Sequence, residues 1–275
     1  MQKHTLGNTT DLTFSIPELV PYINWTYFYH AWGIREENGY DLRQEATTLM
    51  ELWTAGDKHT VFRVRLFPAR SHDEDILLFD DKDVAAQPPG TSNATPLHTV
   101  PLLRQQHAPF LCLADFIPPL GRECGRLGIF ASSVPFQVDG LLQQTVADRL
   151  AEATAEYGHE LVRKQVWGYA PQENLSPKEL FAERYVGKRP AVGYPSLPDQ
   201  SLNFLLNDIL DFPSMGITLT ENGAMIPHAS TSGLMLSHPL CKHFSIGNIG
   251  EDQLQDYAGR RNMDAEALRK FFNII

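Results

Sequence analysis

The spacing of apolar residues changes along the chain, and each spacing predicts a different kind of element. Between residues 60 and 67, apolar side chains alternate with Arg63 and Arg65, which predicts a strand with one face in the core. Between Val146 and Val166, apolar side chains recur every three or four residues, which predicts a long amphipathic helix. The chain therefore combines strands and helices without a regular repeat of the two.

Weaker patterns predict the remaining elements. Helices are expected after the capping boxes Ser15–Glu18 and Ser176–Glu179 and over residues 43–54, 202–210, 252–260 and 264–272. Strands are expected over residues 75–79, 110–116, 127–131, 234–237 and 243–249, with a hairpin turning at Asn222-Gly223 and loops over residues 80–93 and 189–198. Because most strands are joined by turns and the helices come in blocks, these elements predict an α+β fold with an antiparallel sheet in one domain.

Composition narrows the function classes. The 275 residues carry 33 acidic and 23 basic side chains, a formal charge of −10, so nucleic acid is not an expected partner. No apolar run approaches the roughly 20 residues that cross a bilayer, so no membrane partner is expected. The start of the chain lacks the apolar segment of a signal peptide, and the three cysteines lie far apart, which indicates free thiols and a cytoplasmic location.

Several common catalytic and cofactor motifs are missing. The chain has no glycine motif for dinucleotides or phosphates, no nucleophile elbow and no HExxH zinc motif. The segment His238–His243 contains two histidines and a cysteine, but not at the spacing of a zinc site, so we interpret it as a structural turn. We therefore predict no catalytic residues and no metal ligands in this chain.

The proline-rich loop of residues 189–198 is the first candidate binding feature. Its prolines push the preceding residues towards extended conformations and cannot donate to a sheet. The peptide groups of residues 191–193 are therefore expected to need partners outside regular structure. Arg189 offers a fork of donors for a carboxylate and Tyr194 offers a flat face, which suits an amino acid joined to a nucleoside. The alternative is a stiff surface crossover with a solvated arginine.

A second candidate feature is a row of acidic side chains at every fourth position of the long helix. The members of this row, which share one helix face, are Asp148, Glu152, Glu156 and Glu160. Like charges at that spacing are unfavourable by roughly a few tenths of a kcal/mol per pair, and a facing cation would relieve them. The simpler interpretation is a solvated helix face. In the aromatic stretch of residues 22–32, which also suits a ligand wall, we interpret Tyr27 as a core residue.

Six segments, in order, resemble the S-adenosylmethionine-binding activation domain at the carboxyl end of cobalamin-dependent methionine synthase. They are Val20–Thr26, Ala147–Glu152, Trp167–Pro171, Arg189–Pro195, Leu219–Met225 and Ser237–Pro239. The similarity runs from about Leu19 to Phe272, nearly the whole chain. Each motif alone is weak, but several uncommon motifs in one order leave little room for chance.

The resemblance implies a C-shaped single domain, with a bent antiparallel sheet flanked by helices, over residues 19–275 after an N-terminal extension of residues 1–18. It implies a shallow groove for S-adenosylmethionine, with Arg189 on the ligand's carboxylate. The other residues that it implies for this groove are Asn24, Glu152, Glu183, Ala191, Gly193, Tyr194 and Met235. Asp148 is implied to receive the cobalamin-ligating histidine of a partner domain when that histidine leaves cobalt.

This chain departs from the family pattern at four places. Asn24 replaces a common aspartate, so an ammonium group meets no anion there. Met235 replaces an aromatic residue and offers a thioether contact in place of stacking. Gln200 replaces a histidine after the proline-rich loop. The region between Ala131 and Val146 is shorter than usual, which affects docking on a cobalamin domain more than ligand binding.

The resemblance implies a module that positions S-adenosylmethionine for reductive methylation of inactive cobalamin, with an electron from a flavodoxin-type donor. Because the chain has no cobalamin motif, cobalamin is expected only through the cobalamin-binding domain of methionine synthase. The chain is thus expected to be a module or subunit of a methyltransferase, and not catalytic in isolation. One alternative is a free-standing sensor or store of S-adenosylmethionine without a cobalamin partner. Another is an independent transferase or hydrolase, for which no activated nucleophile is visible.

Overall fold

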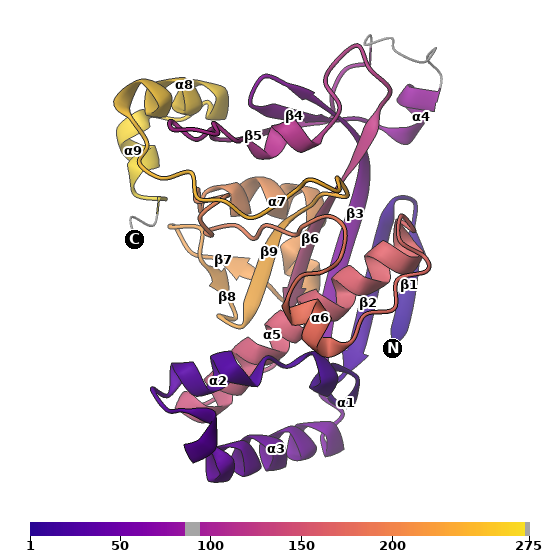
Figure 1. The fold of residues 1–275 in the computed structure, drawn as a ribbon, viewed down its shortest axis with the longest axis vertical. Coiled ribbons are helices and arrows are strands. Elements are labelled where there is room, and N and C mark those ends of the chain that lie inside the picture. Colours follow the sequence, from indigo (N-terminus) through magenta and orange to yellow (C-terminus); the bar gives the residue numbers. More distant parts are fainter. Residues whose placement is uncertain (86–93, 273–275) are drawn as a thin grey trace.

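The computed structural model describes residues 1–85 and 94–272. Within these residues a seven-stranded sheet is built on the long strand β3 (His59–His72; Figure 1). One edge of β3 pairs with β6 (Gly125–Ser133), and β6 pairs in turn with β9 (Ser230–Met235). Two strands pair with the other edge of β3, one after the other along its length. The first is β2 (Thr9–Ser15), which carries β1 (Gln2–Leu6) on its outer edge, and the second is β4 (Asp75–Leu78), which carries β5 (His98–Pro101). Every strand pair is antiparallel, which confirms the predicted α+β class.

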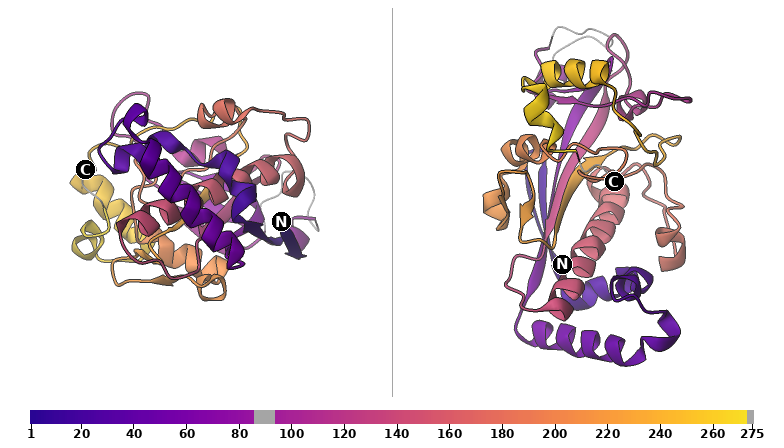
Figure 2. Two further views of the ribbon diagram at one scale, coloured as in Figure 1. Left: turned by 90° about the horizontal axis from the view of Figure 1, so that it is seen from below. Right: turned by 90° about the vertical axis from the view of Figure 1, so that its left-hand side faces the viewer.

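Two helices cover opposite faces of this sheet, as the right-hand view of Figure 2 shows. Helix α5 (Leu141–Leu161) packs on the face that carries Phe62 and Phe130, and α7 (Leu202–Leu210) packs on the face that carries Ile129. Because neighbouring residues of a strand point to opposite faces, Ile129 and Phe130 of β6 enter different cores. The central strands of the sheet are therefore buried on both sides, whereas β1 is exposed, and α5 is anchored on the sheet by one of the two cores.

The arginines of β3 explain why this strand was expected to have only one buried face. Arg63 and Arg65 lie on the α7 side, where Arg63 Nη1 donates to the carbonyl oxygen of Leu210 at 2.6 Å and Arg65 Nη1 to that of Ile209 at 3.3 Å. The last carbonyl groups of a helix have no partners within the helix and favour cations. The two arginines thus cap the carboxyl end of α7. The face of β3 that carries these charged residues is therefore covered by a helix, although its polar sequence is typical of an exposed face.

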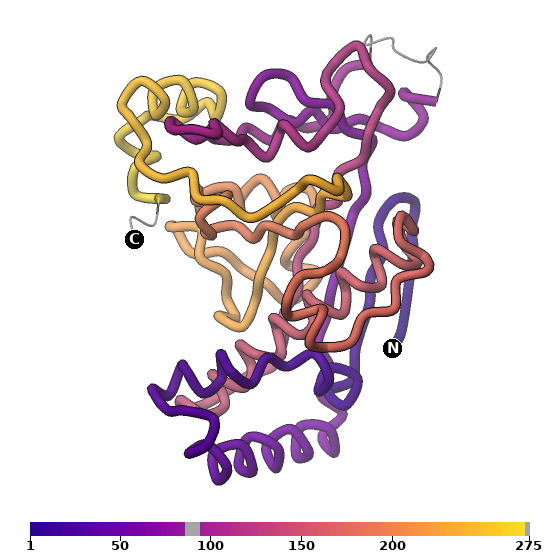
Figure 3. The backbone as a smooth tube through the Cα atoms, in the orientation of Figure 1, coloured from indigo at the N-terminus to yellow at the C-terminus, as the bar shows by residue number. Residues whose placement is uncertain are grey.

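Two further groups of helices form the two ends of the molecule. Helices α1 (Ile16–Leu19), α2 (Trp25–Ala31) and α3 (Tyr40–Ala55) form one end, and α8 (Glu251–Arg261) and α9 (Ala265–Arg269) form the other. Figure 3 shows both ends extending to the same side of β3. The remaining elements are α4 (Asp81–Ala85), α6 (Pro177–Phe181) and the hairpin of β7 (Thr218–Leu219) and β8 (Met225–Ile226). No helix in the described residues is both long and apolar enough to span a membrane.

Most predicted elements are confirmed, and two predicted strands are wrong. Residues 110–116 contain a short 3-10 helix, Leu113–Phe116, because Asp115 accepts the N–H of Cys112 and closes a turn. Residues 243–249 are irregular. Strands β1 and β2 were not predicted, and both lie in the stretch expected as an N-terminal extension. Part of the predicted loop of residues 80–93 is helix α4, and residues 86–93 lie outside the described part of the chain.

The proline-rich loop runs along the free edge of β9. Leu234 N–H donates to Pro190 O at 3.0 Å, and Val192 N–H donates to Ser232 O at 2.9 Å. This approach requires a glycine, because a Cβ at Gly233 would lie 2.2 Å from Pro190 O and 2.8 Å from the Cα of Ala191. Gly233 therefore sets the distance between the sheet and the loop.

We predict that Gly233→Ala lowers the free energy of unfolding by about 1–3 kcal/mol, because backbone atoms of the loop must move away from the added methyl group. Urea denaturation measures this change. Gly259→Ala on α8 is the matched control, since nothing lies within 4 Å of a Cβ there. That variant is expected to gain up to about 1 kcal/mol, because alanine favours a helix over glycine. Equal effects of the two substitutions would contradict the role of Gly233.

Candidate functional site

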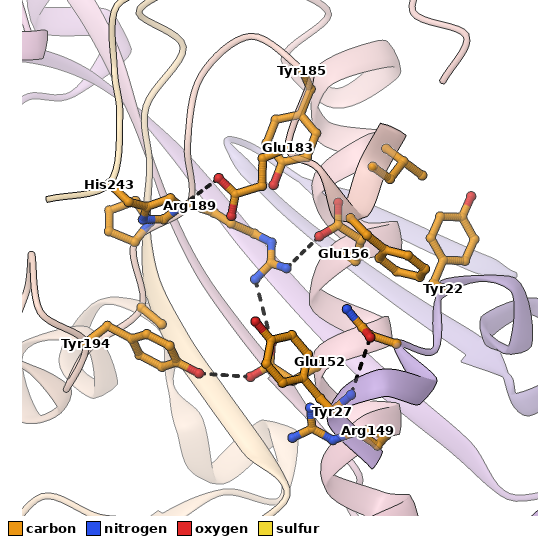
Figure 4. A pocket seen from close by; sticks show the side chains of 15 residues that line it. Tyr22, Tyr27, Arg149, Glu152, Glu156, Glu183, Tyr185, Arg189, Tyr194 and His243 are labelled. Atoms are coloured by element: carbon orange, nitrogen blue, oxygen red, sulfur yellow. Dashed lines mark hydrogen bonds and ion pairs between the residues drawn. The ribbon is translucent and has the colours of Figure 1, made fainter. Parts of the chain in front are cut away.

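A groove of about 390 Å³ lies between α5, the segment around α2 and the chain that follows α6 (Figure 4). Six of the eight residues predicted for ligand binding line it, and they are Asn24, Glu152, Glu183, Arg189, Ala191 and Tyr194. Its other lining residues are Tyr22, Tyr27, Arg149, Glu156, Leu180, Phe181, Tyr185, Pro190 and His243. Four segments that are far apart in sequence therefore meet at one concave surface.

Arg189 crosses the groove towards the acidic face of α5. Its Nη2 donates to Glu156 Oε2 at 2.7 Å, and its Nη1 lies 4.0 Å from Glu152 Oε2 (Figure 4). Burial alone lowers the pKa of Arg189, but the negative charges of Glu156 and Glu152 outweigh it and raise that pKa. The guanidinium group thus stays charged while it is mostly covered by protein.

The acidic row on α5 is not a solvated face, so the simpler interpretation of that row was wrong. The side chain of Glu156 is only 9% exposed, and its partner is the cation Arg189. One turn further along, Glu160 accepts a hydrogen bond from Tyr22 Oη at 2.8 Å and pairs with Lys164. The four-residue spacing places the carboxylates of the row along one face of α5 at intervals of about 6 Å. Those of Glu152 and Glu156 line the groove.

Two buried atoms of the ion pair have no hydrogen-bond partner within the described residues. They are Nε of Arg189 and Oε1 of Glu156. A buried donor or acceptor without a partner is unfavourable by about 1–3 kcal/mol. The ion pair therefore leaves one donor and one acceptor unsatisfied just beneath the surface of the groove.

Buried cations lie under the groove, where residues 162–166 wind as a π-helix at the end of α5. Arg163 has a fully covered side chain, binds Glu173 with Nη2 at 2.6 Å from Oε1, and lies 4.1 Å from the centre of the Tyr185 ring. Burial, followed by the charges of Arg163 and Arg189, holds the pKa of His159 well below its usual value. His159 is therefore neutral and does not compete with Arg189 as a cation for Glu156.

Glu183 reaches the groove from a residue with a left-handed backbone, at a φ of 50°. Its Oε2 lies 3.1 Å from His243 Nε2 and 3.4 Å from Lys188 Nζ. The hydrogen bond from His243 lowers the pKa of Glu183 despite its partial burial. Glu183 therefore adds a further negative charge to the groove at neutral pH, besides the carboxylates of Glu152 and Glu156.

Tyr194 and Tyr27 present the exposed aromatic surfaces of the groove. The side chain of Tyr194 is 54% exposed, and its Oη lies 3.4 Å from Glu152 Oε1. The charge of Glu152, together with burial, raises the pKa of Tyr194, so its phenol stays neutral. Tyr27 is 61% exposed, and its interpretation as a core residue was wrong. Asn24 caps α2 by accepting the N–H of Tyr27 at 3.5 Å.

The peptide groups of the proline-rich loop have more partners in the protein than the sequence predicted. Val192 N–H donates to Ser232 O of β9, so for that group the prediction is wrong. Gly193 N–H donates at 2.9 Å to the O of Leu197, a loop residue outside the helices and strands, as predicted. Ala191 lies opposite Gly233, and the hydrogen bonds at that pair come from the neighbouring residues. In this arrangement the N–H of Ala191 itself points away from β9. The N–H of Ala191, which lines the groove, is therefore not used in pairing with β9.

Two predicted ligand-binding residues lie elsewhere. Gly193 borders a second cavity of about 440 Å³, which shares Tyr194 with the groove. Met235 is fully buried in the core between the sheet and α5. Neither residue lines the groove around Arg189, and both remain predictions as ligand contacts.

Asp148 lies on α5 outside the groove, one turn before Glu152. Its Oδ1 lies 2.8 Å from Gln144 Nε2 and 3.1 Å from His228 Nδ1. The sequence predicted Asp148 as a contact for a partner domain, and nothing in the sequence singled out His228, which precedes β9.

Four groove residues with polar side chains were not singled out by the sequence analysis, and they are Tyr22, Arg149, Tyr185 and His243. Two of them lie inside segments that carry the resemblance, Val20–Thr26 and Ala147–Glu152, so membership of a matching segment was a usable signal. The other two lie outside those segments. Their place in the groove depends on the path of the chain after α6.

No metal-binding arrangement is found in the described residues, where no group of three or more His, Cys, Asp and Glu side chains is close enough to hold an ion. The segment His238–His243 begins with a turn, closed by Cys241 N–H donating to His238 O at 3.0 Å. This agrees with its interpretation as a structural turn.

Two comparisons identify known proteins that are similar to this chain. The sequence pattern of the family described as vitamin B12 dependent methionine synthase, activation domain, matches residues 15–262. A crystal structure described as the MetH reactivation domain bound to AdoHcy is similar with a TM-score of 0.86 at 32% sequence identity. That similarity covers 98% of this chain and 90% of the other.

We predict that Arg189→Gln lowers the free energy of unfolding by about 2 kcal/mol, because it leaves the covered carboxylate of Glu156 without its cation. The loss is expected to shrink when Glu156→Gln is present, and a double-mutant cycle by urea denaturation measures this coupling. Arg269→Gln is the control, since the Arg269 side chain is 45% exposed. It is expected to change stability by less than about 1 kcal/mol. Additive effects of the two groove substitutions would show that the ion pair does not form.

Proposed function

The chain belongs to the activation-domain family of vitamin B12-dependent methionine synthase, and from that premise we propose that it holds S-adenosylmethionine for the repair of inactive cobalamin. The observation that carries this proposal is the ion pair of Arg189 and Glu156 in the groove, with one donor and one acceptor left unpartnered. An amino-acid end with a carboxylate and an ammonium group offers the matching acceptor and donors. The similar MetH reactivation domain was solved with AdoHcy, which has such an end.

The charges of the groove agree with a ligand of this kind. Glu152 and Glu183 add negative charge beside the pair of Arg189 and Glu156. S-adenosylmethionine carries a sulfonium and an ammonium group against a single carboxylate, so its net positive charge suits this balance. Arg189 would bind the carboxylate, Glu152 and Glu183 would face the positive groups, and Ala191 would donate a backbone N–H. Tyr194 would offer its exposed face to the adenine.

The chain itself would contribute by positioning S-adenosylmethionine relative to the cobalamin of a partner domain. When bound, S-adenosylmethionine supplies the methyl group, and cobalamin on a partner domain supplies the metal that receives it. The residues of the groove would orient the ligand on the rigid wall of α5, which reduces the entropy lost on reaching the productive geometry. Cobalamin would come from the cobalamin-binding domain of methionine synthase, and the electron from a flavodoxin-type donor.

Asp148 is the candidate contact with that partner domain. Its carboxylate lies on the same helix as Glu152 but outside the groove, at a side-chain exposure of 26%. We propose that it receives the histidine that leaves cobalt. The alternative of a free-standing sensor or store would need no such contact, and it is favoured by the short, non-helical connection of residues 134–140 between β6 and α5.

We predict that S-adenosylmethionine binds the purified chain and that Arg189→Gln weakens this binding by about 1.5–3 kcal/mol, the value of a charged hydrogen bond. Isothermal calorimetry measures both affinities. Methylthioadenosine is the control ligand, because it lacks the amino-acid end and should bind both proteins with similar affinity. An equal loss for the two ligands would indicate that Arg189 does not bind the carboxylate.

We predict that Asp148→Ala leaves the affinity for S-adenosylmethionine within about twofold of the original, since Asp148 is outside the groove. The same variant is expected to slow the reductive methylation of cobalamin on an added cobalamin-binding domain, followed by its absorption spectrum. A rate equal to that of the unmodified chain would reject the docking role. It would also favour the sensor or store.

A further inference from the structure

Asp148 already has an imidazole partner within this chain. Gln144 Nε2 donates to Asp148 Oδ1 at 2.8 Å from one helical turn earlier, and His228 Nδ1 lies 3.1 Å from the same oxygen. A carboxylate accepts hydrogen bonds but does not donate them, so the proton of this contact is on His228 Nδ1. His228 therefore makes with Asp148 the contact that the proposed function assigns to a histidine of the partner domain.

The two existing hydrogen bonds limit what an incoming ring can do. An oxygen of a carboxylate has about two lone-pair sites, and Gln144 and His228 use both on Oδ1. A third N–H group reaches this oxygen only after one of the two donors leaves, whereas a ring that used Oδ2 instead would share the carboxylate with His228. Gln144 is on the same helix as Asp148, whereas His228 comes from the connection between β8 and β9, which lies beside α5 (Figure 1).

The contact of His228 is weak enough to be exchanged. The His228 side chain is 80% exposed, whereas that of Asp148 is 26% exposed. An exposed pair of this kind shifts an equilibrium by about two- to fivefold. Water already reaches most of the ring, so moving His228 into solvent uncovers little apolar surface. The carboxylate, which is better covered, stays in place on the helix.

We propose that His228 is an internal occupant of the histidine site on Asp148 and is displaced when a partner's imidazole N–H arrives. The proposal rests on the docking role given to Asp148 above and specifies how that site is regulated. In the undocked chain His228 keeps the carboxylate hydrogen-bonded. It thereby lowers the affinity for the partner, so that docking depends on an imidazole that binds Asp148 better than His228 does.

The first test concerns the contact itself and uses the full chain alone. The ring signals of His228 in a nitrogen-detected NMR spectrum are assigned by their loss in His228→Ala. They are expected to move in Asp148→Ala and to stay unchanged in His4→Ala, an exposed histidine variant on β1. Signals of His228 that do not respond to Asp148→Ala would overturn the proposal and leave the proposed binding of S-adenosylmethionine untouched.

The second test adds the cobalamin-binding domain of methionine synthase, loaded with a diamagnetic cobalamin, to the chain with S-adenosylmethionine present. The signals of His228 are expected to shift to their positions in Asp148→Ala. Calorimetry is expected to show that His228→Ala binds the domain two- to fivefold more tightly than the unmodified chain and His4→Ala do. Unmoved His228 signals in the complex would show that both imidazoles share the carboxylate, which overturns displacement.

Equal or weaker binding by His228→Ala would overturn the proposal as well, because an internal competitor must be favourable to remove. His228→Asn, which keeps a polar side chain of smaller size, checks that such a result does not come from disturbed folding of the β8–β9 connection. If the unmodified chain does not bind the domain at all, the docking role of Asp148 fails together with this inference. Binding of S-adenosylmethionine by the same sample separates that failure from failure of the groove.

Discussion

The ion pair between Arg189 and Glu156 depends on a distance that the sheet sets. The residue after Arg189 is Pro190, whose carbonyl oxygen accepts Leu234 N–H while its chain passes over Gly233. On the opposite side, Glu156 is fixed by α5, which packs on the sheet through a continuous core. The cation and the carboxylate therefore approach each other from two rigid elements. The distance of 2.7 Å between Arg189 Nη2 and Glu156 Oε2 therefore depends on the packing of both elements on the sheet.

This arrangement stabilises a mostly covered arginine without using all of its donors. A lone buried guanidinium would be unfavourable, and one paired bidentately by two carboxylates would have only one of its five N–H donors left. Here Glu156 binds one nitrogen closely, Glu152 stays at 4.0 Å, and Nε has no partner within the described residues. Arg189 is thus stabilised in the absence of ligand and still keeps part of its donor fork for one. The same partial pairing leaves Oε1 of Glu156 for a positive group.

The sequence predicted the elements whose signals are local. The 3.6-residue period identified α5, capping boxes identified α1 and α6, and the proline-rich loop was identified from its backbone chemistry. The sequence analysis failed for segments whose structure or exposure depends on tertiary contacts. Residues 243–249 have the alternation of a strand, but Ile246 N–H donates to Pro195 O and the side chains fill two cores from an irregular chain. The charged face of α5 was interpreted as solvated because its cation, Arg189, lies 33 residues further along the chain.

Helix α5 joins the two proposed activities of this chain in one rigid element. A residue rises about 1.5 Å along a helix, so Asp148 and Glu156 are about 12 Å apart along its axis, with Glu152 between them. A ligand on Glu152 and a partner on Asp148 would therefore be placed relative to each other by the helix alone, without a moving segment between them. The apolar core fixes one side of α5 against the sheet, and the ion pair with Arg189 fixes the side that faces the groove. Because the acidic residues recur at every fourth position, the number of helical turns between them determines the distance between the proposed ligand site and the proposed docking contact.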